Sequence, residues 1–187
     1  ARRKVHALRL AHDAIMVGSG TALADDPDLT VRDLGARRQP VRVVLDRLLR
    51  HAPDSRLGRT ARDVPVWLVH GPDAPAAARE TWAATGATLV EGAETGGHLD
   101  LHHALKTLAG KGLTRILSEG GSTVAGALLH AHLVDDLALF NGGVLIGSEG
   151  HPALGALGLT ALADASRPTL REMQVLGGDL YSLWSLA

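Results

Sequence analysis

The chain has 187 residues, with 19 Lys plus Arg against 20 Asp plus Glu, so its formal net charge is −1 and no overall field attracts nucleic acid or an anionic membrane. Cysteine is absent, which excludes disulfides, thiol nucleophiles and thiolate metal sites and favours a cytoplasmic location. No segment approaches the roughly 18 apolar residues of a spanning helix, so we expect a soluble protein and, at this length, one domain over residues 1–187.

Apolar runs of strand length alternate with helix-like segments through most of the chain, which is typical of an α/β fold. The chain begins with a predicted helix, because Val5, Leu8 and Ala11 share one face. Further helices are expected over residues 74–84, 101–110 and 124–131. The expected strands are residues 14–17, 41–45, 64–69, 87–90 and 113–117. Several of them are apolar on both faces, as covered parallel strands require.

The C-terminal part of the chain changes character. After the apolar residues 137–140, a glycine-broken run and a polar loop extend to Pro168. Residues 170–176 and 180–186 then flank a Gly-Gly-Asp turn, which predicts a β-hairpin. We therefore expect a mixed, mostly parallel sheet flanked by helices, with this antiparallel hairpin at its edge. Because such domains seldom open on a helix, we also expect the first strand of the fold to be missing from this chain.

The segment ILSEGGSTVAG, residues 116–126, sets a double-glycine turn between an apolar strand and a helix. Glycines let a ligand approach the backbone, and the free N–H groups at a helix start favour a phosphate. Glu119 ends the strand, where open α/β sheets bind ligands, and a carboxylate partly withdrawn from water there can donate a proton or hold a sugar hydroxyl. The alternative is a plain turn capped by Ser122 or Thr123, with a solvated Glu119.

The stretch GTALADDPDLTVR, residues 20–32, crowds three carboxylates around one proline directly after an expected strand. We expect residues 18–32 to form the loop that leaves the carboxyl end of that strand, on the same rim as Glu119. Asp25 and Asp26 can accept backbone N–H bonds there. In the alternative interpretation, these carboxylates only cap the loop.

Four arginines are positioned to clamp an anionic group. Arg9 precedes the strand at residues 14–17, and Arg32 ends the acidic stretch. Arg47 and Arg50 follow the carboxyl end of the next strand, where an arginine can pair with an adenosine 2′-phosphate and select NADP over NAD. A solvated surface arginine is the alternative in each case.

Three histidines suggest a metal site, since His98 and His102 have the i, i+4 spacing that puts two imidazoles on one helical face, with His103 beside them. No third ligand is evident nearby in the sequence. We therefore favour exposed helix histidines and predict no metal.

Two long motifs, DAIMVGSGTALADDPDLTVR at residues 13–32 and SEGGSTVAGALL at residues 118–129, closely resemble the reductase domain of the bacterial bifunctional riboflavin-biosynthesis deaminase/reductase. Residues 39–46, 142–150 and 155–159 extend the similarity over nearly the whole chain. The resemblance implies a dihydrofolate-reductase-like fold and an NADPH-dependent reduction of 5-amino-6-(5-phosphoribosylamino)uracil to the ribitylamino product. The family's opening strand, with its Ser-Leu-Asp-Gly-type turn and a lysine, and its zinc-binding deaminase domain are expected to be absent.

The same resemblance implies roles for single residues. Arg9, Leu29, Arg32 and Glu119 line the substrate, with the arginines near its phosphate. The NADPH side comprises Thr21, Asp25, Arg47, Gly120, Gly121, Ser122, Thr123, Val124 and Ala125. On this resemblance, the acidic stretch is expected to lie between the cofactor and the sugar of the substrate and to contact both.

The implied chemistry is a hydride transfer from nicotinamide C4 to ribose C1′ of an open-chain imine, and Glu119 is our hypothesis for the group that holds or protonates that end. The partners are then a phosphorylated pyrimidine substrate and, as the resemblance and the strand-rich C-terminus suggest, a second copy of the chain in a homodimer. Two alternatives remain: a related pterin or pyrimidine reductase of the same fold, and a non-catalytic NADP-binding module.

Overall fold

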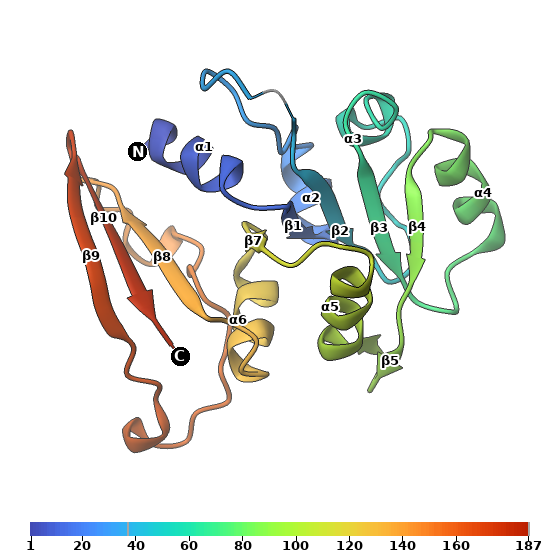
Figure 1. The fold of residues 1–187 in the computed structure, drawn as a ribbon. Coiled ribbons are helices and arrows are strands. Elements are labelled where there is room, and N and C mark those ends of the chain that lie inside the picture. The colour runs from blue at the N-terminus through green and yellow to red at the C-terminus, as the bar shows by residue number, and fades with distance from the viewer. Residues whose placement is uncertain (37, 187) are drawn as a thin grey trace. The chain divides into compact units, whose positions relative to one another are not determined.

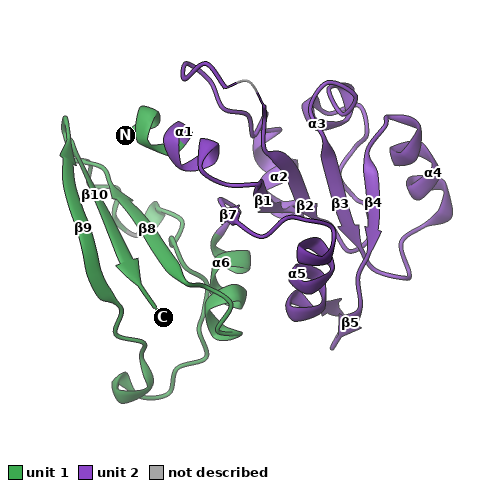
Figure 2. Cartoon of the chain, viewed as in Figure 1, with its two compact units in different colours: residues 1–5, 122–187 green, residues 6–121 purple. Residues whose placement is uncertain are grey.

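The structure is a computed structural model that describes residues 1–36 and 38–186. The chain divides into two compact units, His6–Gly121 and Ala1–Val5 with Ser122–Ala187, which Figure 2 distinguishes by colour. The single domain expected from the sequence stays a prediction, and each unit is described by itself. Within the described residues, none of the helices has both the length and the apolar character needed to cross a membrane.

The unit of residues 6–121 is built on a five-stranded parallel sheet with the strand order β4-β3-β2-β1-β7. Its strands are β1 (Ala14–Gly18), β2 (Val41–Leu45), β3 (Val66–His70), β4 (Thr88–Glu91) and β7 (Ile116–Ser118). Every residue of β1 and β2 is buried, because their side chains are covered on both faces. The strand-length apolar runs of the sequence therefore predicted this sheet correctly.

The helices of this unit are α2 (Ser19–Asp25), α3 (Arg56–Arg59), α4 (Ala76–Ala84), α5 (Leu101–Gly110) and the part of α1 (Arg2–Leu10) from His6 onward. Figure 1 shows α5 in front of the parallel sheet. A short hairpin of β5 (Glu94–Thr95) and β6 (His98–Leu99) precedes α5. The buried core cluster draws on strands and helices alike and includes Ile15, Val17, Val44, Leu57, Leu68 and Trp82.

Two sequence expectations are wrong in this unit. Residues 18–32 were expected to be one loop, but Ser19–Asp25 forms α2, since Ala22 to Ala24 favour a helix and Asp26 ends it in a left-handed conformation with φ 39°. His98 and His102 were expected on one helix, but His98 lies in β6. Asp100 is the reason, because its side chain accepts from His103 N–H and starts α5 only at Leu101.

The second unit contains α6 (Ser122–His130) and a three-stranded antiparallel sheet with the order β8-β10-β9. Its strands are β8 (Asp136–Asn141), β9 (Thr169–Leu176) and β10 (Asp179–Ser185), and the two short helical turns η1 (Gly147–Glu149) and η2 (Leu162–Asp164) lie in the polar loop. The predicted hairpin is confirmed as β9–β10, with φ 71° at Gly177 in its turn. It pairs with β8 in a sheet of its own rather than with a parallel strand. The α/β class, the parallel sheet and the C-terminal hairpin are thus confirmed.

Candidate active site

The parallel sheet has a reversal in strand order between β1 and β7. From β1 the chain steps outward through β2 and β3 to β4, and then returns through α5 to β7 on the other side of β1. Open α/β sheets bind ligands at such a point, outside the carboxyl ends of the strands. At this edge the chain leaves β1 through Gly18 and leaves β7 through Glu119, whose N–H donates to the carbonyl of Met16 over 2.9 Å.

Gly120 fits where no other residue does. A Cβ added to it would lie 2.5 Å from Val17 Cα and 2.6 Å from Gly18 N, both backbone atoms at the end of β1. Gly121 follows with φ +23°, and a Cβ there would lie 3.1 Å from Thr21 Oγ1. The ends of β1 and β7 therefore approach each other as closely as backbones allow, and the exposed Gly121 leaves room for a ligand.

The remaining residues of the predicted cradle begin α6, in the other unit. Ser122 is the first helical residue, so neither it nor Thr123 precedes the helix as a cap, which corrects that interpretation. Val124 and Ala125 complete the first turn and are half-buried.

Arg9 and Glu119 form a bidentate ion pair. Arg9 Nε donates to Glu119 Oε1 over 2.7 Å and Arg9 Nη2 to Glu119 Oε2 over 2.6 Å, with the two side chains 14% and 21% exposed. Arg9 Nη1 donates to the carbonyl of Thr30 over 2.8 Å. Such a fork between planar groups fixes both side chains in orientation. The structure thus joins two residues that were predicted separately from distant parts of the sequence.

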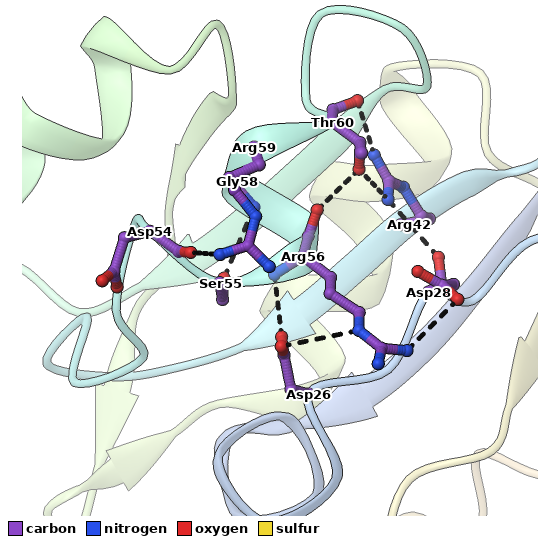
Figure 3. Close-up of polar contacts among 9 residues, drawn as sticks. All are labelled: Asp26, Asp28, Arg42, Asp54, Ser55, Arg56, Gly58, Arg59 and Thr60. Carbon is purple, nitrogen blue, oxygen red and sulfur yellow. Dashed lines mark hydrogen bonds and ion pairs between the residues drawn. The ribbon is translucent and has the colours of Figure 1, made fainter.

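The acidic stretch is joined to α3, as Figure 3 shows. Asp26 Oδ1 accepts from the backbone N–H of Arg56 over 2.8 Å, and the Arg56 guanidinium lies 3.8 Å from Asp26 and 3.5 Å from Asp28. The expectation that Asp26 accepts a backbone N–H bond is confirmed. Asp25, at the end of α2, is exposed. Two of the three carboxylates therefore hold the chain in place.

Arg42, on the middle strand β2, also holds the acidic stretch in place, through the carbonyl of Asp28. It is 1% exposed, and its guanidinium donates to the carbonyls of Asp28 (3.3 Å), Thr60 (3.0 Å) and Val64 (2.5 Å) and to Thr60 Oγ1 (2.8 Å). Burial lowers the pKa of Arg42 to about 10, against the smaller opposite effects of Asp28 and Asp63. The sequence reasoning missed Arg42, although a lone cation inside an apolar strand was a visible signal.

The acidic stretch continues from Asp28 into the site. Leu29 is buried with φ 51°, a conformation that a leucine adopts only where its surroundings impose it, and Thr30 supplies the carbonyl that orients Arg9. Arg32 has an exposed side chain, and its backbone N–H donates to His6 Nδ1 over 3.2 Å. Of the predicted substrate residues, Arg9 and Glu119 are thus connected to each other directly, and Arg9 is connected to the segment of Leu29 through Thr30. Among the described residues, the Arg32 side chain makes no hydrogen bond or ion pair with them.

The arginines after β2 have partners of their own. Arg47 Nη1 lies 3.2 Å from Glu94 Oε2, and Arg50 Nη2 donates weakly to Ser19 Oγ over 3.3 Å. Glu94 was not predicted as a site residue. Within residues 1–36 and 38–186, no group of three or more His, Asp or Glu is arranged to hold a metal ion. His103 instead accepts the N–H of Ala93 through Nδ1.

Comparisons with known proteins agree with this architecture. A family described as the RibD C-terminal domain matches residues 1–181. The riboflavin biosynthesis protein RibD of Chlamydia pneumoniae is 34% identical over 191 residues, which cover 100% of this chain and 50% of that protein. The 2,5-diamino-6-ribosylamino-4(3H)-pyrimidinone 5′-phosphate reductase of Methanothermobacter thermautotrophicus is 35% identical over 181 residues, covering 95% of this chain and 82% of that protein.

Among solved structures, the chain is similar to a diaminohydroxyphosphoribosylaminopyrimidine deaminase/5-amino-6-(5-phosphoribosylamino)uracil reductase from Thermotoga maritima, with a TM-score of 0.74 at 23% identity. That match covers 98% of this chain and 48% of the other, so the chain spans about half the length of these bacterial relatives. Since the family match extends over residues 1–181, the chain belongs to the RibD C-terminal domain family.

Proposed function

We propose that the chain catalyses the NADPH-dependent reduction of 5-amino-6-(5-phosphoribosylamino)uracil to 5-amino-6-(5-phosphoribitylamino)uracil in riboflavin biosynthesis. The observation that carries the proposal is the Arg9–Glu119 pair at the strand-order reversal, where α/β sheets bind their ligands. Membership of the RibD C-terminal domain family and the names of its relatives as phosphoribosyl-pyrimidine reductases support it.

The residues at this edge fit a phosphate-bearing dinucleotide. The exposed Gly121 backbone is open to close approach by a ligand. The residues that the resemblance assigns to the cofactor continue along the chain as Ser122–Ala125, the first turn of α6, and free amide groups at a helix start favour a phosphate. Thr21 lies against Gly121, Asp25 is exposed at the end of α2, and Arg47 is positioned after β2 for an adenosine 2′-phosphate. NADPH, when bound, supplies the hydride.

On the substrate side, Arg9 and Glu119 act as one unit. Each terminal nitrogen of Arg9 uses one N–H in the contacts described, which leaves a second N–H for a substrate phosphate or hydroxyl. Glu119 accepts a hydrogen bond from a ribose hydroxyl or from the protonated imine nitrogen bonded to C1′, while C1′ itself takes the hydride, and the guanidinium fixes the orientation of Glu119. Leu29 forms an apolar wall, and Arg32 adds a second cation near the phosphate.

The test is the NADPH absorbance band, followed with the full chain and the phosphoribosylamino-uracil. We expect substrate-dependent oxidation that falls at least 100-fold in kcat for Glu119→Gln, the size of a general acid–base contribution. The control is Glu80→Gln, an exposed change on α4, which should match wild type. Oxidation only with a pterin, or only with the still-aminated pyrimidine, would indicate a related reductase. NADPH binding without any oxidation would indicate a non-catalytic binding module.

We also propose that the protein is a cytoplasmic homodimer. The edge strand β9 supports the dimer, because Leu170, Met173 and Val175 are 45%, 65% and 74% exposed along it. An apolar edge of this kind is usually covered by a partner. Sedimentation at micromolar concentration should give twice the mass of the chain, and a monomer would contradict this part of the proposal.

A further inference from the structure

The region after β2 brings a cation and a carboxylate together. Arg47 Nη1 lies 3.2 Å from Glu94 Oε2, with side chains 36% and 15% exposed. The other carboxylate oxygen, Oε1, is buried and has no hydrogen-bond partner among the described residues. A buried acceptor without a donor is costly, so the Glu94 carboxylate gains a bond if its side chain turns toward a donor on a ligand.

The position of Glu94 is built into the fold. A Cβ at Gly71 would lie 1.7 Å from Glu94 Oε1, so any larger residue there would force the carboxylate to turn away. Gly71 N–H donates to the carbonyl of Arg47 over 2.8 Å. The hairpin that carries Glu94 is tied to α5, because Ala93 N–H donates to His103 Nδ1 over 3.1 Å and its carbonyl accepts from Asp100 over 2.9 Å. Glu94 is therefore held beside Arg47.

The two nicotinamide dinucleotides differ at one place, where NADPH carries a ribose 2′-phosphate and NADH a 2′-hydroxyl. In dinucleotide-binding sheets a carboxylate accepts from the 2′-hydroxyl, whereas an arginine pairs with the 2′-phosphate. Here both groups lie together after β2. NADPH can pair with Arg47 only if the arginine leaves Glu94, and the carboxylate then repels the 2′-phosphate. NADH instead offers the Glu94 carboxylate a hydroxyl donor.

We propose that Glu94 is a specificity-determining residue that, by holding Arg47, weakens the preference of the enzyme for NADPH over NADH. This inference rests on the proposed function, because it requires that the adenosine end of the cofactor lies over β2.

The experiment measures the dissociation constants of NADPH and NADH from nicotinamide fluorescence, with the full chain and four variants. For Glu94→Gln we expect NADPH to bind about tenfold more tightly and NADH a few-fold more weakly, since one adjacent charge is removed. Glu94→Ala should move the ratio in the same direction. Arg47→Ala should weaken NADPH at least tenfold and change NADH less than twofold. The control is Glu91→Gln, an exposed residue at the end of β4 that lies 3.9 Å from Arg79.

The outcomes separate the two proposals. If wild type binds neither dinucleotide, the proposed function fails and the role of Glu94 fails with it. If both dinucleotides bind, and the Glu94 variants melt normally but keep the affinity ratio within twofold of wild type, the proposed function stands and the role of Glu94 is overturned. A ratio that also moves in Glu91→Gln would likewise overturn it, because the effect would then come from general surface charge.

Discussion

Replacing Gly120 by alanine tests the close approach of the two strand ends at the site. The added methyl would lie 2.5, 2.6 and 2.9 Å from Val17 Cα, Gly18 N and Val17 C, distances that real Cβ contacts do not reach. These are backbone atoms of the fully buried strand β1, so the clash cannot be relieved by rotating a side chain. Overpacking in a rigid core costs about 1–3 kcal/mol, and we expect the upper end, about 3 kcal/mol.

For a chain of this length, 1 kcal/mol corresponds to roughly 2–4 °C in Tm, so Gly120→Ala should lower the melting temperature by about 6–12 °C in calorimetry. The matched control is Gly110→Ala at the end of α5, where a Cβ meets nothing within 4 Å. That change should be neutral or stabilise by up to about 1 kcal/mol, because alanine favours a helix. If Gly120→Ala melts within 1 °C of wild type, the proposed close contact between β1 and β7 is wrong.

The other predictions concern buried charge. Arg42→Met removes the donor from three carbonyls and one hydroxyl, so the free energy of unfolding in urea should fall by about 2–4 kcal/mol, with partial rescue by Arg42→Lys and no change for the exposed Arg3→Met. Burial lowers the pKa of His51 from its ordinary 6.5, against the smaller opposite effects of Asp46, Asp26 and Asp54. As the pH falls, the unfolded chain therefore takes up a proton at His51 before the folded chain does. The stability that comes from keeping His51 neutral is complete above pH 6.5 and is lost as the pH falls below that value. His51→Phe should keep the stacking on Trp82, whose ring centroid lies 5.7 Å from that of His51, and flatten the stability profile below pH 6.5. An unchanged slope would refute the assignment.

The sequence predicted those elements whose pattern is local. Residues 41–45 were predicted to the residue as β2, because five apolar or inward-facing positions bounded by Pro40 and Asp46 leave little choice. The β9–β10 hairpin followed from its Gly-Gly-Asp turn. α2 was missed because its seven residues lie between a glycine and a proline, which read as a loop. The β5–β6 hairpin has a Gly96-Gly97 turn that a closer reading of turn signals would have found.

The candidate site likewise contains residues that a local sequence pattern reveals and residues that it does not. Glu119 was recognised because a carboxylate ends an apolar strand before two glycines, a signal contained in four residues. Its pairing with Arg9 joins residues 110 positions apart in the sequence, so no local pattern contains it. Glu94 was missed for the same reason, since Arg47 reaches it only once the sheet has formed. Arg42 does have a local signal, a cation inside an apolar strand, but its partner Thr60 lies beside it only in the folded protein.

The most direct test of the proposed reduction follows the hydride itself. The full chain is incubated with phosphoribosylamino-uracil and NADPH that carries deuterium on both C4 positions, and the product is analysed by mass spectrometry. We predict one deuterium per product molecule, located at C1′ of the ribityl chain, and an initial rate of labelled product at least 100-fold lower when Glu119→Gln replaces wild type under the same conditions. A product without deuterium, or no product although NADPH is bound, would contradict the proposal that this domain transfers hydride to its substrate.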